Sequence, residues 1–140
     1  MADGLLWFTD PGVIAQKLSA AAGEIDGRVY DIVEEATFKA AERMDEIVME
    51  GGVNPTKKGG PRVDSKAMIR SIDHTTSING RGRVQGSFGF IKNAPEWTEY
   101  QEKGTRYIPA MLAFAEAQVL AINELQNQLD SGKWFPTSLL

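Results

Sequence analysis

The chain has 140 residues, a typical length for one domain, and 42% of them are hydrophobic, which is ordinary for a globular protein with a modest core. It contains no cysteine, which excludes disulfides, thiolate catalysis and cysteine-ligated zinc. The net charge of −4 is uneven, with a balance of −7 over residues 1–56, +5 over residues 57–83 and −2 over residues 84–140. We expect a single domain spanning residues 1–140, made in the cytoplasm, with no secretory signal and no apolar run near the roughly 20 residues of a membrane-spanning helix.

The first residues predict an arm followed by a helix. Residues 1–8 are too apolar for a free tail, so we expect an N-terminal arm that packs on its own subunit or the next, with Leu5, Trp7 and Phe8 as interface candidates. Thr9 or Asp10 can cap a helix whose first residue is Pro11. Gly23 is expected to interrupt or end this short helix.

A longer helix is predicted from Glu24. Apolar residues recur at three- and four-residue spacing from Ile25 to Val48, about seven turns, and acids occupy the opposite face. Gly51-Gly52 predicts its end, because glycine accepts a left-handed C-terminal cap. A helix this long exceeds what one small core must bury, so its far end is expected to reach a partner. Residues 51–62, rich in glycine, proline and lysine, predict a flexible loop.

The middle of the chain predicts a short helix and a hairpin. Asp64 or Ser65 can cap a helix that ends near Ile72, and period-two character follows. Asn79-Gly80 is the favoured pair for a tight hairpin turn. Val84, Phe88 and Phe90 fall on one face of the second strand. Gly86 and Gly89 weaken this strand or mark where another backbone lies close.

A last helix is predicted from about Pro109 to Leu129. Its expected buried stripe comprises Met111 or Leu112, Ala115, Val119, Ile122 and Leu125 or Leu129. Residues 131–140 form a C-terminal arm that either tucks back on its own subunit or clasps a neighbour, with Trp134 and Phe135 as interface candidates. The fold class is therefore α+β, with a long N-terminal helix and a C-terminal helix packed on a small antiparallel hairpin, and with extended apolar termini.

The sequence offers little for catalysis. His74 is the only histidine, and Ser87 in "QGSFG" does not match a nucleophile elbow. Ser71, Asp73 and His74 are too close in sequence to converge as a triad, because adjacent residues point apart. Glu99 and Glu102 could meet on one helical face as a carboxylate pair, but a solvated face paired with Lys103 and Arg106 is the simpler interpretation. We expect no catalytic, cofactor or metal site.

The order of the motifs resembles a known family. Val63-Asp64-Ser65-Lys66 precedes Arg70-Ser71-Ile72 and the hairpin, and Tyr100-Gln101-Glu102-Lys103-Gly104-Thr105 precedes Ile108-Pro109-Ala110-Met111. This arrangement, over residues 9 to 128, resembles the small morphogenesis proteins at the head–tail junction of long-tailed bacteriophages, called neck, tail-completion or minor tail proteins. Two departures are Lys66, where the family has glycine, and Lys103, where it has an aromatic residue. The matching and associated positions are Asp64, Arg70, Ser71, Ile72, Trp97, Tyr100, Glu102, Gly104, Thr105, Arg106 and Pro109.

The resemblance implies a structural virion protein without a reaction of its own, a neck, tail-completion or tail-terminator component. Such proteins form homo-oligomeric rings, often sixfold, between head-closure or connector proteins and the tail tube, around the path of the genomic DNA. A surplus of acid beside that path would repel phosphate and let the duplex slide without sequence-specific binding. The stretch from Ala94 to Leu112 is then interpreted as a joint that sets the angle between sheet and last helix. Trp97 and Tyr100 are expected to supply the apolar area that holds this joint against the hairpin or the long helix.

Two alternatives stay open. A nucleic-acid-binding module would use the basic segment, with its cations at Lys57, Lys58, Arg62, Arg81 and Arg83. A small oligomeric enzyme would use the acids Glu99 and Glu102. The first predicts salt-dependent DNA binding, and the second a pocket and a substrate or metal requirement.

Overall fold

The fold is α+β, as expected. The computed structural model describes residues 11–52, 65–80, 82–106 and 109–137. Its elements in chain order are α2 (Pro11–Glu50), α3 (Ser65–Ser71), β1 (Ile72–Ile78), β2 (Val84–Phe90), α4 (Thr98–Lys103) and α5 (Ala113–Asp130). The expected N-terminal arm at residues 1–8 and most of the expected loop at residues 51–62 lie outside the described residues.

The helix α2 is continuous, so the prediction that Gly23 interrupts it is wrong. A glycine inside a helix costs about 1 kcal/mol relative to alanine. Contacts from far along the chain compensate for this cost, because the backbone of Thr137 binds Glu24 and the carbonyl of Lys133 binds Arg28. The residues on the C-terminal side of Gly23 are thereby held in helical geometry.

The end of α2 is confirmed at Gly51-Gly52. Gly51 and Gly52 have φ of 90° and 104°, and their N–H groups donate to Val48 and Ile47 at 3.1 and 2.7 Å. This pair of bonds satisfies carbonyls that the helix leaves open. A Cβ on Gly52 would lie 2.8 Å from the Cα of Met111, so glycine also permits the close approach of the segment before α5.

The strands β1 and β2 form a two-stranded antiparallel sheet. Their register places Ile72 opposite Phe90 and Thr75 opposite Ser87. Phe88 and Phe90 contact buried residues of the core, which confirms that they share one inward face.

The hairpin turn is wider than predicted. The N–H of Asn79 donates to Arg83 at 3.0 Å, and the N–H of Gly82 donates to Asn79 at 3.0 Å. Asn79-Gly80 therefore begins the turn and is not its central pair. The Asn79 side chain instead accepts the backbone N–H of Arg83, and Gly82 supplies the left-handed position with φ of 73°.

Gly86 marks a close approach, as its position in the strand predicted, but the neighbours are side chains of α2. A Cβ at Gly86 would lie 2.5 Å from Val33 Cγ1 and 2.7 Å from Thr37 Cγ2. The hairpin can therefore lie directly on α2 at this point only because the side chain is missing.

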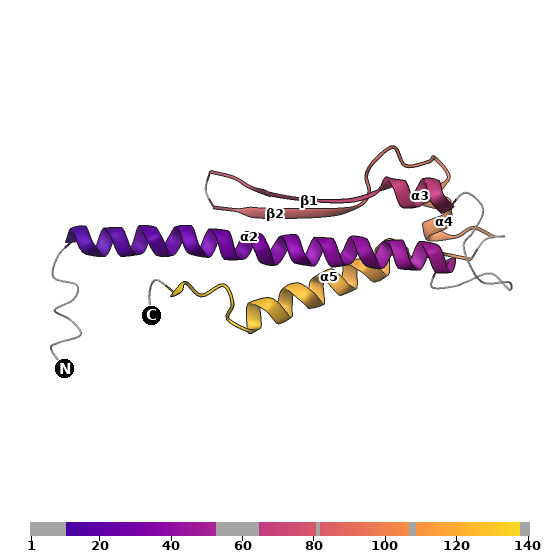
Figure 1. Ribbon diagram of the computed structural model, residues 1–140. Coiled ribbons are helices and arrows are strands. Elements are labelled where there is room, and N and C mark those ends of the chain that lie inside the picture. Colours follow the sequence, from indigo (N-terminus) through magenta and orange to yellow (C-terminus); the bar gives the residue numbers. More distant parts are fainter. Residues whose placement is uncertain (1–10, 53–64, 81, 107–108, 138–140) are drawn as a thin grey trace.

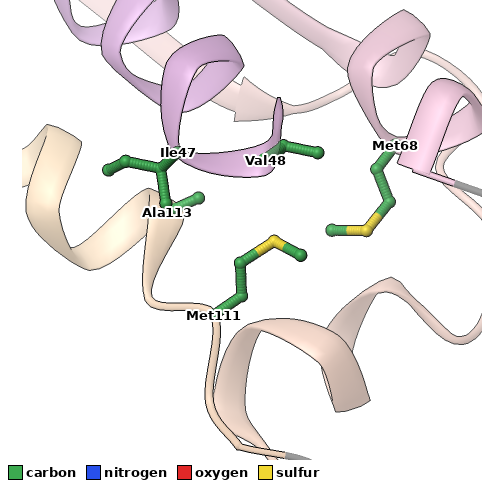
Figure 2. Packing of buried hydrophobic residues seen from close by; sticks show 5 residues of the cluster. All are labelled: Ile47, Val48, Met68, Met111 and Ala113. Atoms are coloured by element: carbon green, nitrogen blue, oxygen red, sulfur yellow. The ribbon is translucent and has the colours of Figure 1, made fainter. Parts of the chain in front are cut away.

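The helix α2 runs the length of the molecule, with the hairpin along one side and α5 along another (Figure 1). A first core cluster comprises Ile47, Val48, Met68, Met111 and Ala113 at the C-terminal end of α2 (Figure 2). A second comprises Ala40, Met44, Ala117 and Ala121 between α2 and α5. Phe88 and Phe114, with ring centroids 5.4 Å apart, bring the hairpin and α5 into contact beside it.

The helix α5 begins at Ala113, four residues later than predicted, and buries a different face. Ala113, Ala117 and Ala121 face the core, whereas Val119 and Ile122 are 57% and 58% exposed. Alanine on this face allows α5 to approach Ala40 of α2 closely, since the distance between packed helices depends on the side chains at the contact. The expected stripe through Val119 and Ile122 is therefore wrong.

Candidate interface surfaces

The stretch from Ala94 to Leu112 forms a joint held by Glu102. The Glu102 carboxylate, near the end of α4, accepts the backbone N–H groups of Ala113, Phe114 and Ala115 at 2.8, 2.7 and 3.2 Å. These groups belong to the first turn of α5, where the N–H donors have no partner within the helix. The residue before α5, Leu112, makes no side-chain cap, so a residue of α4 supplies it.

Backbone bonds reinforce this joint. The N–H groups of Met111 and Leu112 donate to the carbonyls of Gln101 and Glu102 at 2.8 and 3.2 Å. Leu112 has φ of 58°, a left-handed conformation that is uncommon outside glycine. These bonds explain why α5 starts at Ala113 and not near Pro109.

The aromatic residues of the joint differ in role. Trp97 is partly buried against the first core cluster, as predicted. Tyr100 is 61% exposed, so the prediction that it holds the joint by apolar contact is wrong. Gly104 has φ of 77° and its N–H donates to the Tyr100 carbonyl at 2.8 Å, which ends α4. Thr105, Arg106 and Pro109 follow it and are exposed.

Glu99 and Glu102 bind different groups. Glu99 forms an exposed ion pair with Lys103, with Oε1 and Nζ 2.7 Å apart. This hydrogen bond lowers the pKa of Glu99 and raises the pKa of Lys103. Glu102 is engaged by the backbone of α5. The two carboxylates thus have separate structural partners.

The motif Arg70-Ser71-Ile72 forms the junction between α3 and the hairpin. Ser71 is fully buried, and its hydroxyl donates to the Met68 carbonyl at 2.6 Å. Its own carbonyl accepts the N–H groups of Ile91 and Lys92 at 2.7 and 2.9 Å. Ile72 packs against both core clusters, while Arg70 is exposed. Asp64, the other residue of this motif, lies outside the described residues.

The remaining candidates for chemistry are also in structural contacts. His74 packs edge-on against Phe38, with ring centroids 5.5 Å apart. Asp73 pairs with Lys92 at 3.3 Å, and the Ser87 hydroxyl lies 3.0 Å from that of Thr75 on the paired strand. Among the residues that the structure describes, no group of three or more histidines and acids could hold a metal ion.

The acidic side of α2 faces solvent, with Glu34, Glu35 and Glu42 all exposed. Lys39 bridges Glu35 and Glu124 at 3.1 and 2.8 Å and so connects this side of α2 to α5. The hydrogen bond that Lys39 donates to Glu124 is the main cause of the raised pKa of Lys39.

The structure describes part of the predicted basic segment, residues 57–83. Arg83 is exposed beside the hairpin turn, whereas the other four cations of the nucleic-acid alternative lie outside the described residues: Lys57, Lys58, Arg62 and Arg81.

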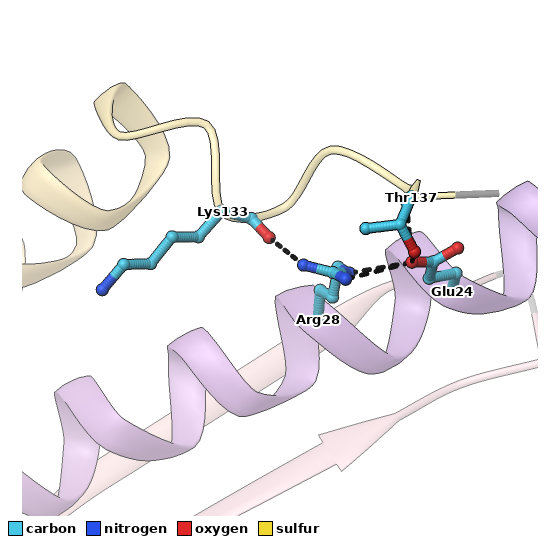
Figure 3. Close-up of polar contacts among 4 residues, drawn as sticks. All are labelled: Glu24, Arg28, Lys133 and Thr137. Atoms are coloured by element: carbon cyan, nitrogen blue, oxygen red, sulfur yellow. Dashed lines mark hydrogen bonds and ion pairs between the residues drawn. The ribbon is translucent and has the colours of Figure 1, made fainter. Parts of the chain in front are cut away.

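The C-terminal segment, residues 131–137, folds back along α2 of its own chain (Figure 3). Arg28 donates to the Lys133 carbonyl at 2.9 Å, and Thr137 donates to Glu24 through both its N–H and its hydroxyl. Of the two alternatives for this segment, the tuck onto its own subunit is the one observed over residues 131–137. Trp134 and Phe135 nevertheless remain 36% and 43% exposed.

Two apolar faces are left at the surface. The first, which we call the α2 projection face, comprises Val13, Ile14 and Leu18 near the start of α2. The second, the α5 outer face, comprises Val119, Ile122 and Leu129. Leu18 is 59% exposed, and Leu129 is 45% exposed. The other interface candidates, Leu5, Trp7 and Phe8, lie outside the described residues.

Two hollows adjoin these elements. One, of about 320 Å³, lies between α2, β2 and α5 and includes Val33, Phe88 and Ile122 in its lining. The other, of about 340 Å³, lies beside the joint, where the buried hydroxyl of Thr98 has no hydrogen-bond partner among the described residues. Both are open. The first is lined mainly by apolar side chains, which suits contact with another protein surface, whereas the second combines apolar residues such as Phe90 and Phe114 with charged ones such as Glu99 and Lys103.

None of the described helices has a segment both long and apolar enough to cross a bilayer.

Comparison with protein-family models, curated proteins and solved structures finds no match to the chain.

Proposed function

We propose that the chain is a structural subunit of the head–tail junction of a long-tailed bacteriophage. In this proposal it assembles as a homo-oligomeric ring around the DNA path, in the manner of a neck, tail-completion or tail-terminator protein. It would join the head connector or head-closure proteins to the tail tube and be located in the virion. No reaction is assigned to it, since Glu99 and Glu102 are bound to Lys103 and to the backbone of α5.

The observation that carries the proposal is the presence of two separate apolar faces on one small protein. Val13 and Leu18 lie near one end of α2, and Val119, Ile122 and Leu129 are exposed on α5, with Ile122 at the edge of the hollow between α2, β2 and α5. A ring requires one patch of each subunit to dock on a different patch of the next. Together with the motif order that resembles the neck proteins, these faces favour an assembling subunit over a monomeric catalyst.

The acidic side of α2 supports a place beside DNA that does not bind it. Glu34, Glu35 and Glu42 are exposed together on one side of a rigid helix. Carboxylates facing the channel would repel phosphates, so the duplex could pass without adhering. A structure of the assembled ring with these three residues on its outer surface would refute this part of the proposal.

The proposal is tested in the phage that encodes the chain. A nonsense mutation at an early codon should yield filled heads and complete tails that fail to join, and a plasmid copy of the gene should restore joined particles. Electron microscopy of lysates distinguishes the two products. Imaging of purified particles should place the protein at the head–tail junction.

A single variant addresses the enzyme alternative, which would use Glu99. Glu99→Ala removes only an exposed ion pair, so complementation should be retained. Joined, infectious particles formed without any copy of the protein would refute the proposal. Strong, salt-dependent DNA binding by the purified chain would instead favour the nucleic-acid-binding alternative.

A further inference from the structure

The start of α2 has the composition of an interface. Residues 11–23 contain one charged residue, Lys17, whereas residues 24–50 contain twelve. This segment extends past both the hairpin turn, which reaches Asp26, and the C-terminal segment, which reaches Glu24 (Figure 1). A helix end surrounded by water would be expected to be polar on all sides, and depletion of charge is typical of interface cores.

The α2 projection face continues a stripe that is buried further along the same helix. Ile14, Ile25, Ala36 and Ile47 are spaced by eleven residues, which is close to three full turns, so they lie along one line. Ala36 and Ile47 on this line are 0% and 1% exposed. Leu18 stands next to the line, on the part of α2 that extends past the hairpin turn and the C-terminal segment.

The α5 outer face has a matching pattern. Its positions are spaced by four, three, four and three residues: Ala115, Val119, Ile122, Gln126 and Leu129. The α2 projection face begins a stripe with spacing of four, three and four, formed by Ile14, Leu18, Ala21 and Ile25. This is the spacing with which helices pack side by side in coiled coils. Ala21 on this stripe is only 4% exposed, so the open part is the one that includes Leu18.

The two faces also complement each other in size and charge. The exposed residues that follow Leu18 on α2 are small, whereas Val119, Ile122 and Leu129 are bulky, and large side chains pack well against small ones across an interface. These small residues are Ser19, Ala20, Ala22 and Gly23. Lys17 is exposed beside Leu18, and Glu116 and Asp130 are exposed on α5. Contact between two α5 outer faces would instead bring bulky side chains against bulky side chains. Contact between two α2 projection faces would bring Lys17 against Lys17.

We propose that the α2 projection face of one copy docks on the α5 outer face of a second copy of this chain. The two faces cannot meet within one copy, because Ala117 and Ala121 hold the opposite side of α5 against α2. The contact joins two different patches, so each copy has one of each free, and repetition gives a ring or a filament. This inference rests on the proposed function, since it supplies the contact that the ring requires.

Cysteine cross-linking tests the contact directly, because the chain contains no cysteine of its own. Leu18→Cys and Ile122→Cys variants of the full chain, one carrying a C-terminal size tag, are mixed and treated with a short bis-maleimide. We expect a cross-linked product that contains one copy of each variant. Leu18→Cys alone and Ile122→Cys alone should each give no cross-linked dimer. Met49→Cys, an exposed control on α2 outside both faces, should also give none.

Charge reversal gives a second measurement. Lys17→Glu should weaken self-association by roughly fivefold in sedimentation experiments, as expected for one surface ion pair. A compensating Asp130→Lys or Glu116→Lys substitution should restore it. Since all three side chains are exposed, circular dichroism should show unchanged helix content in each variant.

Several results would overturn the inference. Dimers of Leu18→Cys alone or Ile122→Cys alone would show that like faces meet. A protein that stays monomeric at the highest attainable concentration, with no mixed product, would show that the faces do not bind each other. Slow maleimide labelling of Leu18→Cys in the monomer, accelerated by deletion of residues 1–8, would assign the face to the chain's own N-terminal residues.

The outcomes separate this contact from the proposed function. Mixed cross-links formed by a protein that is missing from purified particles would keep the contact and refute the head–tail role. Protein located at the junction, but with no mixed cross-link in intact particles, would keep the role and refute the contact.

Discussion

Replacing Glu102 with alanine removes the connection between α4 and the first turn of α5. The carboxylate accepts three backbone N–H groups at 2.7–3.2 Å, and no side chain of Leu112 can replace it. Loss of a side-chain cap typically costs about 1 kcal/mol and at most about 2. A negative charge at a helix N-terminus contributes about 0.3–1 kcal/mol more. We expect Glu102→Ala to lower the free energy of unfolding by about 2 kcal/mol.

Chemical denaturation monitored by circular dichroism measures this loss, and a thermal scan should show Tm lower by roughly 6–8 °C for a chain of this size. Glu102→Gln keeps one acceptor oxygen but loses the charge, so about half the effect is expected. Glu99→Ala is the matched control, because its ion pair with Lys103 is exposed and worth less than about 0.5 kcal/mol. Equal effects of Glu102→Ala and Glu99→Ala would refute the reasoning.

Three further predictions concern other parts of the fold. Gly86→Ala should lower the free energy of unfolding, measured by urea denaturation, by about 1–3 kcal/mol, because the added Cβ would overlap Val33 and Thr37. Gly80→Ala should have no such effect, because the space around Gly80 is open. Equal effects of the two substitutions would contradict the close packing at Gly86. Burial is the main cause of a raised pKa at Asp45, and repulsion from Glu42 adds to it. The protonated carboxyl group of Asp45 therefore contributes to stability below the ordinary pKa of aspartate, and this contribution is lost as the pH rises through the raised pKa of the folded protein. Asp45→Asn should therefore raise the free energy of unfolding slightly at pH 7, where solvent screens the effect, and give no gain near pH 3. An equal gain at both pH values would disprove this assignment. Deletion of Lys133 to Leu140 should accelerate amide hydrogen exchange at residues 15–28 by roughly tenfold, because the segment contributes hydrogen bonds to Glu24 and Arg28 worth about 1–2 kcal/mol. Exchange near Met44 should stay unchanged. An unchanged rate at residues 15–28 would show that α2 is stable there without the segment.

Local signals in the sequence were sufficient for most of the element types, although the short helix α4 was not predicted. Gly51-Gly52 marked the end of α2, and the period-two pattern around Phe88 and Phe90 marked the hairpin. The continuity of α2 through Gly23 could not be predicted, because the contacts that hold Glu24 and Arg28 come from residues more than a hundred positions away.

The buried face of α5 was not determined by periodicity either. The helix has two apolar stripes, one of alanines and one with Val119 and Ile122, and hydrophobicity favours the second. Close packing against Ala40 selected the alanines. The same choice left the bulky stripe at the surface, where it became a candidate interface.

The role of Glu102 was missed, although a signal existed. Leu112 stands where a helix N-terminus usually has serine, threonine, asparagine or aspartate, so the cap had to come from elsewhere. Glu102, ten residues before Leu112 and near the end of α4, meets that need only because the backbone of Met111 and Leu112 lies against α4.

The contact between Glu24 and Thr137 joins residues 113 positions apart, and this separation has a consequence for synthesis. At about 5–20 residues per second, the ribosome needs roughly 6–23 s to make the intervening chain. The middle of α2 leaves the ribosome long before the segment that will bind it exists. A chain released early would therefore keep Arg28 and Glu24 without these partners and present a loosened α2 to proteases. The part of α2 around Glu24 and Arg28 thus gains these hydrogen bonds only after residue 137 has been synthesised.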